Sequence, residues 1–256
     1  MRWELLRSAV VSSANAPPRD KSRRMNFFDE LNLPPLELSK APADPVFSTA
    51  QFTSPYSGFL NTGIARECWD TERVLAYYLT TLPENDFAGK SVLELGCGSA
   101  GLAGLALAFT HRPSRVVLTD GNPKCISRLC ETISLNSLHC PVEAKKLLWD
   151  SDHLHETFDY IIVSDCLYEH EYHGALLSTL QEHLSESGRI FLMNPVRGNS
   201  FSRFHDLVAS CSDFAVDVHE KYDDTVWAIH KRLQTESSRT YDSNKNYPVL
   251  SVLRRK

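Results

Sequence analysis

SVLELGCGSAGLAGLALA, residues 91–108, is the stretch that decides the fold of this 256-residue chain. A short apolar run leads to Glu94, then to the spacing Gly96-x-Gly98-x-x-Gly101, and then to a segment rich in alanine and leucine. This order predicts a strand, a tight turn and a helix, because glycine lets the backbone pass close to a ligand at a helix N-terminus. Taken alone, the pattern suits a dinucleotide, S-adenosylmethionine or a simple tight turn.

Strands and helices alternate around this stretch. The expected strands cover residues 91–95, 115–119, 142–148, 158–164, 189–193, 214–219 and 248–253. The main expected helices cover residues 70–82, 101–109, 123–138, 172–185, 201–211 and 227–233, with Asp70 or Thr71 as the cap of the first. The alternation predicts an α/β fold with a doubly wound, mostly parallel sheet of seven strands. The last two strands lack a helical crossover, so we expect them to pair as a hairpin and to place an antiparallel strand near one edge.

The first 60 residues differ from the rest of the chain. Residues 1–24 carry six basic and two acidic residues, and five prolines fall within residues 25–60. We expect a short helix over residues 3–11 and one or two short edge strands after residue 25. The N-terminal arm, residues 1–60, would then pack on a main domain of residues 61–256. The Arg-rich start also leaves a mitochondrial presequence open.

Composition narrows the class of protein. The net charge of −5 argues against general nucleic-acid binding, which needs clustered lysine and arginine. The seven cysteines are scattered without paired spacing, which predicts reduced thiols in the cytoplasm, with the nucleus as a second compartment. The sequence lacks an apolar run of the roughly 18 residues that a membrane helix needs, so we expect no membrane span. The ten histidines show no metal-ligand spacing, so we expect no metal site.

Asp120 is the natural partner of the glycine turn. It ends the strand expected at residues 115–119 and lies 22 residues after Gly98. A carboxylate at this position accepts hydrogen bonds from the ribose hydroxyls of a nicotinamide cofactor or of S-adenosylmethionine. The glycine turn and Asp120 therefore support each other, and both cofactors stay open at this point.

A second group of candidate residues follows the strand expected at residues 158–164. Asp165 and Tyr168 border the crevice where ligands bind in open α/β sheets. A carboxylate favours an ammonium group, and an aromatic face stabilises a cation, so these residues could hold an amine. The alternative is that Asp165 caps a helix and Tyr168 packs. Cys97 and Cys166 suit small filler positions better than nucleophiles.

Other residues near these segments each have two possible roles. Glu94 could stabilise a cationic ligand or fix the glycine turn by hydrogen bonds. Trp69 and Trp149 could flank a cofactor or pack in the core. Asn194-Pro195 resembles a motif of methyltransferases that act on nucleic acids, but it follows a different strand, and we discount it.

The order of these motifs resembles the class I, seven-β-strand S-adenosylmethionine-dependent methyltransferases. Asp165-x-x-Tyr168, with Trp69 before the first strand and Trp149 after the third, resembles family 16, which consists mostly of protein-lysine methyltransferases. Flanking segments are similar to the calmodulin-lysine N-methyltransferases within it. These segments are Asn61-Thr62-Gly63, Val74-Leu75-Ala76-Tyr77-Tyr78, Arg197-Gly198-Asn199 and Asn246-Tyr247-Pro248. The turn departs from that group at Ser99, where a third glycine is usual, and Tyr168 stands where Phe is common.

The resemblance implies a function and a set of site residues. It implies S-adenosylmethionine as cofactor, a protein substrate, calmodulin, and methylation up to the trimethylated state of one of its lysines. The implied cofactor-binding residues are Trp69, Glu94, Gly96, Cys97, Gly98, Asp120, Trp149 and Ser164. Asp165 and Tyr168 are the implied catalytic residues. Because calmodulin is acidic, docking would need a basic surface, for which the candidates are the N-terminal arm, Arg197, Arg203, Lys231 and Arg232.

Other functions stay open at this stage. Within the class, the substrate could be a lysine of a chaperone or an elongation factor. A methyltransferase that acts on nucleic acids or on small molecules is another alternative. The negative net charge disfavours a nucleic-acid substrate. A nicotinamide oxidoreductase is disfavoured by Asp165-x-x-Tyr168 and by the terminal strand pair. A non-catalytic binding module on the same fold is disfavoured by the intact Asp120 and Asp165. The oligomeric state is left open.

Overall fold

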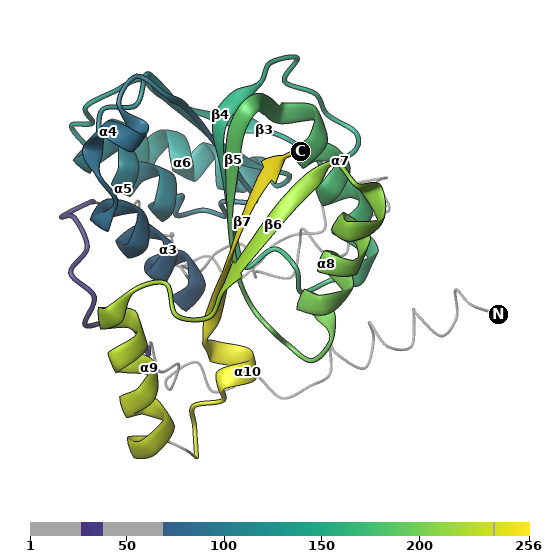
Figure 1. Cartoon of the computed structure of the whole chain (residues 1–256). Helices are drawn as coiled ribbons and strands as arrows, with labels where there is room; N and C mark the ends of the chain where they lie inside the picture. The colour runs from purple at the N-terminus through teal and green to yellow at the C-terminus, as the bar shows by residue number, and fades with distance from the viewer. Residues whose placement is uncertain (1–26, 38–68, 238) are drawn as a thin grey trace, which may run out of the picture.

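The computed structural model describes residues 27–37, 69–237 and 239–256. They contain a seven-stranded sheet with the order β3-β2-β1-β4-β5-β7-β6. Figure 1 shows β7 between β5 and β6. The strands are β1 (Ser91–Leu95), β2 (Arg115–Asp120), β3 (Val142–Lys146), β4 (Phe158–Ser164), β5 (Leu184–Pro195), β6 (Phe214–His219) and β7 (Pro248–Arg255). The predicted α/β fold with a seven-stranded sheet is confirmed.

The direction of the strands also follows the prediction. β1 pairs in parallel with β2 on one side and with β4 on the other. β7 runs antiparallel to both β5 and β6, so the antiparallel strand stands next to the edge strand β6. The chain moves outward from β1 to β3 and then returns to place β4 beside β1. Ligands of open α/β sheets bind at such a reversal, beyond the carboxyl ends of the strands.

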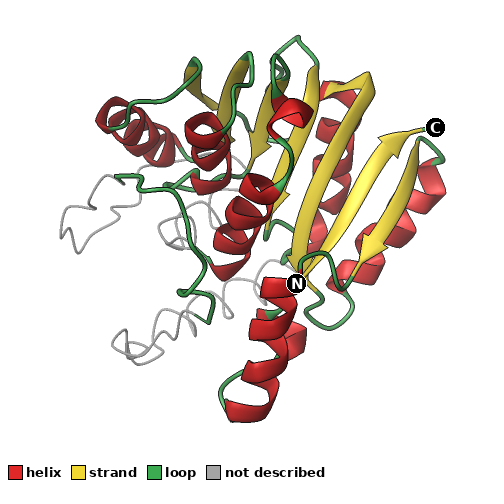
Figure 2. Ribbon diagram, turned by 60° about the vertical axis from the view of Figure 1, so that its left-hand side comes forward, coloured by secondary structure: helices red, strands yellow, loops and turns green. Residues whose placement is uncertain are grey.

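Helices cover both faces of the sheet (Figure 2). One face carries α3 (Asp70–Thr81), α4 (Glu84–Phe87), α5 (Leu102–Thr110), α6 (Pro123–Leu135) and α9 (Asp224–Glu236). The other face carries α7 (His173–His183) and α8 (Ser200–Cys211). Two short helices, η3 (His170–Tyr172) and α10 (Ser243–Asn246), stand in the connections before α7 and before β7. None of the helices in the described ranges is both long and apolar enough to cross a membrane.

A hydrophobic core lies on each side of the sheet, and the alternating side chains of the strands contribute to both. Val92 of β1 belongs to the core beneath α3 and α5, while Leu93 and Leu95 belong to the core beneath α7 and α8. All three side chains are fully buried. Side chains of a strand point alternately to opposite faces, so a continuous apolar run is what a strand covered on both faces requires.

Some element boundaries differ from the prediction. α3 begins at Asp70 with Trp69 as its N-cap residue, and no side chain caps it, so the predicted cap at Asp70 or Thr71 is wrong. The helix predicted to reach residue 185 ends at His183, because Leu184 already pairs with Phe158 as the start of β5. The polar residues that follow Leu184 hide this 12-residue strand in the sequence. α10, with only four residues, was not predicted.

Residues 27–37 pack on the main domain as a turn followed by irregular chain, with no strand among them. Phe28 is fully buried and Leu31 is nearly so. The backbone of Glu37 exchanges two hydrogen bonds with the side chain of Asn136, just after α6. The helix predicted at residues 3–11 lies outside the described residues, as does the rest of the N-terminal arm.

Candidate active site

The glycine turn joins β1 to α5 in a conformation that only glycine adopts readily. Gly96, Gly98 and Gly101 have φ angles of +64°, +63° and +55°. A Cβ atom at Gly96 would lie 2.7 Å from the Cys166 sulfur and 3.1 Å from the ring of Trp149. The turn therefore needs glycine at position 96 for two separate reasons, its backbone angle and the close approach of two side chains.

Asp120 lies directly against this turn, as predicted. Its carboxylate accepts hydrogen bonds from the backbone N–H of Gly98 at 3.0 Å and of Asn122 at 2.8 Å. Burial raises the pKa of Asp120, while the two N–H donors act in the opposite direction. The contact follows from topology, because β1 and β2 are adjacent parallel strands whose carboxyl ends meet.

Glu94 faces away from the surface and holds α5. It is fully buried, and its Oε2 accepts a hydrogen bond from Gly104 N at 2.8 Å. Glu72 of α3 accepts another from Leu102 N at 2.7 Å. Burial, together with the nearby charge of Glu72, raises the pKa of Glu94 well above its usual range. The two carboxylates thus satisfy N–H groups of the first turn of α5, which is where a helix needs acceptors.

Of the remaining predicted cofactor residues, Cys97 belongs to the glycine turn and Trp149 touches it. Trp149 is half-buried and lies against Gly96, and the buried Ser164 ends β4. Trp69 stands at the start of α3, whose Glu72 reaches the start of α5. The pKa of Cys97 is raised well above its usual range by burial and by nearby carboxylates, so its sulfur is a neutral thiol. This fits the interpretation of Cys97 as a filler.

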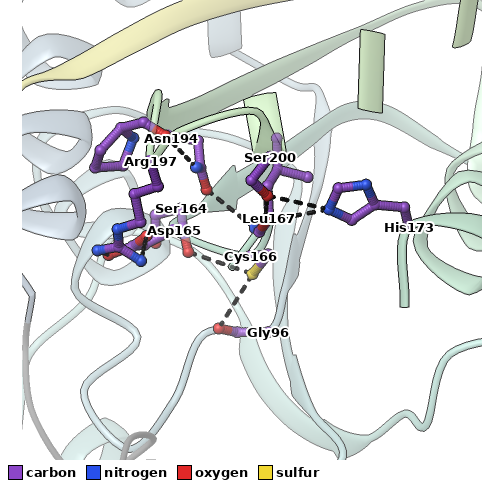
Figure 3. Close-up of polar contacts among 10 residues, drawn as sticks. Gly96, Ser164, Asp165, Cys166, Leu167, His173, Asn194, Arg197 and Ser200 are labelled. Carbon is purple, nitrogen blue, oxygen red and sulfur yellow. Dashed lines mark hydrogen bonds and ion pairs between the residues drawn. The ribbon is translucent and has the colours of Figure 1, made fainter. Parts of the chain in front are cut away.

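The turn after β4 is held by side chains from three other elements (Figure 3). Leu167 N donates to Oδ1 of Asn194 at 3.0 Å. The carbonyl oxygen of Leu167 accepts from the hydroxyl of Ser200 and lies 3.1 Å from Nε2 of His173. All three side chains are buried. Sequence reasoning missed this role for them. For Asn194 a signal existed, because it closes an apolar strand just as Asp120 does.

Asp165 is the first residue of this turn. Its φ angle of +54° is uncommon for a residue with a side chain. The Cys166 sulfur then lies 3.9 Å from the carbonyl oxygen of Gly96, so the two turns touch. Tyr168 is half-buried, and its pKa is raised by burial and by Cys166, Asp120 and Asp165 nearby, so it is a neutral hydroxyl. The turn that carries both predicted catalytic residues therefore touches the glycine turn through Cys166.

Arg197, which the sequence suggests as a docking residue, contacts the turn after β4 through Asp165. Its guanidinium binds both carboxylate oxygens of Asp165, each at 2.8 Å (Figure 3). Arg232, another docking candidate, pairs with Glu30, and Lys231 lies 4.3 Å from the ring centre of Trp227. Three of the four basic side chains proposed for docking, Arg197, Lys231 and Arg232, thus contact other residues of the chain.

Comparison with known proteins identifies the family. A family model described as lysine methyltransferase matches residues 58–210. The chain belongs to the lysine methyltransferase family. It is 36% identical to a calmodulin-lysine N-methyltransferase of Arabidopsis thaliana, over 98% of this chain and 94% of that one. An EEF1A lysine methyltransferase 3 of Xenopus tropicalis is 31% identical over 54% of this chain and 60% of its own length. Membership of this family makes the protein an enzyme.

Solved structures support the same fold. A TehB-like SAM-dependent methyltransferase of Corynebacterium glutamicum aligns with a TM-score of 0.50 and 17% identity, over 71% of this chain and 87% of that one. A ribosomal protein L11 methylase of Lactobacillus delbrueckii subsp. bulgaricus aligns with the same TM-score and 18% identity, over 71% of this chain and 77% of that one. At such identities the likeness establishes the methyltransferase fold and leaves the substrate to other arguments.

Proposed function

We propose that this enzyme uses S-adenosylmethionine to methylate a lysine side chain of calmodulin. The observation that supports the chemistry is the contact between the two turns: the sulfur of Cys166, which directly follows Asp165, lies 3.9 Å from the carbonyl oxygen of Gly96, and Gly98 of the same turn donates to Asp120. The similarity to the Arabidopsis calmodulin-lysine N-methyltransferase supports the substrate, because it covers nearly the whole of both chains.

The residues present fit an adenosylmethionine cofactor. Glycine at position 96 lets Trp149 and Cys166 approach the backbone of the turn closely, and the carboxylate of Asp120 is already held at the end of β2. In this proposal the backbone of Gly96, Cys97 and Gly98 approaches the cofactor and Asp120 binds its ribose hydroxyls. Three further side chains complete the wall of the site: Trp69, Trp149 and Ser164. Glu94 contributes by holding the N-terminus of α5.

The bound cofactor supplies a methyl group on a positively charged sulfur. Asp165 and Tyr168 orient the target lysine, and alignment of the reacting atoms is the main source of rate enhancement in such a reaction. The lysine must first lose a proton to solvent, since its ammonium form has no lone pair and its free pKa is about 10.4. The neutral nitrogen would accept the methyl group as the bond between sulfur and carbon breaks, giving a methylated ammonium group that would lose its own proton only before a further transfer.

A methylation assay with unmodified calmodulin tests this proposal. The purified protein is incubated with calmodulin and cofactor carrying a labelled methyl group, and the products are read by peptide mass spectrometry. We expect label on one lysine, with masses that report one, two or three methyl groups. Label on another protein of a total lysate, with calmodulin unmodified, would reject calmodulin and support the alternative of a chaperone or elongation factor.

A further inference from the structure

The pair of Asp165 and Arg197 is unusual for a site that must bind an ammonium group. The Asp165 side chain is 8% exposed and that of Arg197 is 26% exposed, so the pair is largely shielded from water. Nη2 of the guanidinium donates a hydrogen bond to Oδ2 at 2.8 Å, and Nη1 lies 2.8 Å from Oδ1. This two-point ion pair contains one charge-assisted hydrogen bond, a contact roughly twice as strong as a hydrogen bond between neutral groups. The carboxylate predicted to attract lysine is therefore already neutralised by the protein itself.

The backbone is arranged to keep this pair together. Arg197 has a φ angle of +45° and Asp165 one of +54°, both in the left-handed region that residues with side chains seldom occupy. Arg197 N donates to the carbonyl oxygen of Asn244 at 2.7 Å, and Gly198 N lies 3.3 Å from its Oδ1. Asn244 belongs to α10, which leads into the antiparallel strand β7. Strained conformations persist where surrounding structure enforces them, and they concentrate at functional sites.

The charge state of the substrate explains why such a pair is useful. A lone carboxylate beside the target lysine would stabilise its ammonium form and raise its pKa, which opposes methyl transfer. A carboxylate paired with a guanidinium has no net charge but keeps lone pairs that can accept an N–H from a neutral amine. The pair can therefore orient the amine without favouring its protonated form.

We propose that Arg197 is a positioning residue that cancels the charge of Asp165, so that the target lysine is held as a neutral amine. This inference rests on the proposed lysine methylation. It differs from the earlier interpretation of Arg197 as a docking residue, since docking would change the affinity for an acidic protein but not the protonation of the bound lysine.

The test is the pH dependence of kcat for three variants. Arg197→Met removes the charge, and Arg197→Lys keeps the charge but loses the two-point contact. Arg254→Met, the control, breaks a more exposed ion pair with Asp217 between β6 and β7. The acidic limb of the kcat profile reports ionisation in the enzyme–substrate complex. We expect Arg197→Met to move this limb upward by about 1 to 3 pH units, the range that one nearby opposite charge produces.

Arg197→Lys should lower kcat at every pH while its limb stays near that of the wild type, and Arg254→Met should leave the profile unchanged. If Arg197→Met lowers kcat equally at every pH and the acidic limb does not move, the inference is overturned and Arg197 has only a structural role. A raised KM for calmodulin with an unmoved limb would instead support docking.

A second measurement does not depend on any variant folding. The wild-type protein is saturated with S-adenosylhomocysteine and a peptide whose target lysine carries an isotope-labelled methyl group, and NMR follows that group through a pH titration. We expect the lysine pKa to lie below its free value of about 10.4. A value above that would reject the inference. Absence of methyl transfer by the wild-type protein to any protein would reject the proposed function itself, which separates the two failures.

Discussion

Replacing Gly96 by alanine should damage both stability and cofactor binding, and the chain supplies its own control. Gly89 has a φ angle of +71°, close to the +64° of Gly96, but a Cβ at Gly89 would meet no atom within 4 Å. Gly89→Ala therefore measures the cost of the left-handed backbone alone. Gly96→Ala adds the crowding of Cys166 and Trp149 to the same backbone cost.

The magnitude follows from these two contributions. A left-handed alanine costs about 1–2 kcal/mol. Crowding at 2.7 Å from the Cys166 sulfur adds roughly 1–3 kcal/mol, because that sulfur already lies 3.3 Å from the carbonyl oxygen of Ser164 and cannot retreat freely. In a domain of this size 1 kcal/mol lowers the melting temperature by about 2–4 °C. We expect a loss on the order of 10 °C for Gly96→Ala and roughly half of that or less for Gly89→Ala.

Thermal unfolding of both variants, and calorimetric titration with S-adenosylhomocysteine, measure the two effects. Gly89→Ala should bind the ligand like the wild type, whereas Gly96→Ala should bind it at least tenfold more weakly. In the double variant with Cys166→Ala, the stability loss should be smaller than the sum of the single losses, since the alanine removes the crowding sulfur. Equal melting temperatures for Gly96→Ala and Gly89→Ala would refute the crowding argument.

Three further predictions concern carboxylates. Asp120→Ala should weaken cofactor binding tenfold or more in calorimetry, since the ribose loses its acceptor, and an unchanged affinity would contradict that role. Asp165→Ala should keep cofactor affinity within a few-fold while methyl transfer to calmodulin, followed with labelled cofactor, falls by about 100-fold or more; full activity would rule out an orienting role. Burial raises the folded-state pKa of Glu94 above its ordinary 4.5, so the stability that depends on it is present below that pH and is lost as pH rises through the folded-state pKa. Glu94→Gln keeps an acceptor for Gly104 N and should unfold at a higher temperature than the wild type by a margin that grows from pH 5 to pH 8; a constant margin would contradict a buried charge at Glu94.

The part of the site near the glycine turn could be predicted from the sequence, because its residues lie on neighbouring strands close together in the chain. β1 and β4 begin and end at the residues predicted for them. The contact of Asp120 with Gly98 follows once β1 and β2 are known to be adjacent and parallel. Burial on both faces leaves a continuous apolar run in such strands, and a polar residue at the end of the run marks the edge where ligands bind.

The part of the site that would hold the lysine could not be predicted in the same way. Asp165 and Arg197 lie 32 residues apart and meet only because β4 and β5 are neighbours and because Arg197 takes a left-handed backbone that its residue type does not signal. Asn244, which supports Arg197 through its own carbonyl oxygen, comes from a four-residue helix with no periodic pattern to reveal it. Short motifs report contacts that are local or between adjacent strands, but not contacts set by a rare dihedral angle.

This difference bears on how substrate choice could vary within the family. The residues proposed to bind the cofactor, from Trp69 to Ser164 in the sequence, lie inside the matched residues 58–210, and so does Arg197. Arg197 donates its backbone N–H to Asn244, which lies beyond the residues matched by the family model. The alignment with the Arabidopsis calmodulin-lysine N-methyltransferase covers 98% of this chain and so extends past the family model. If the terminal segment sets the orientation of Arg197, it also sets the charge that a bound lysine meets. Substrate preference would then depend on α10 and β7 as well as on any surface that touches the protein substrate.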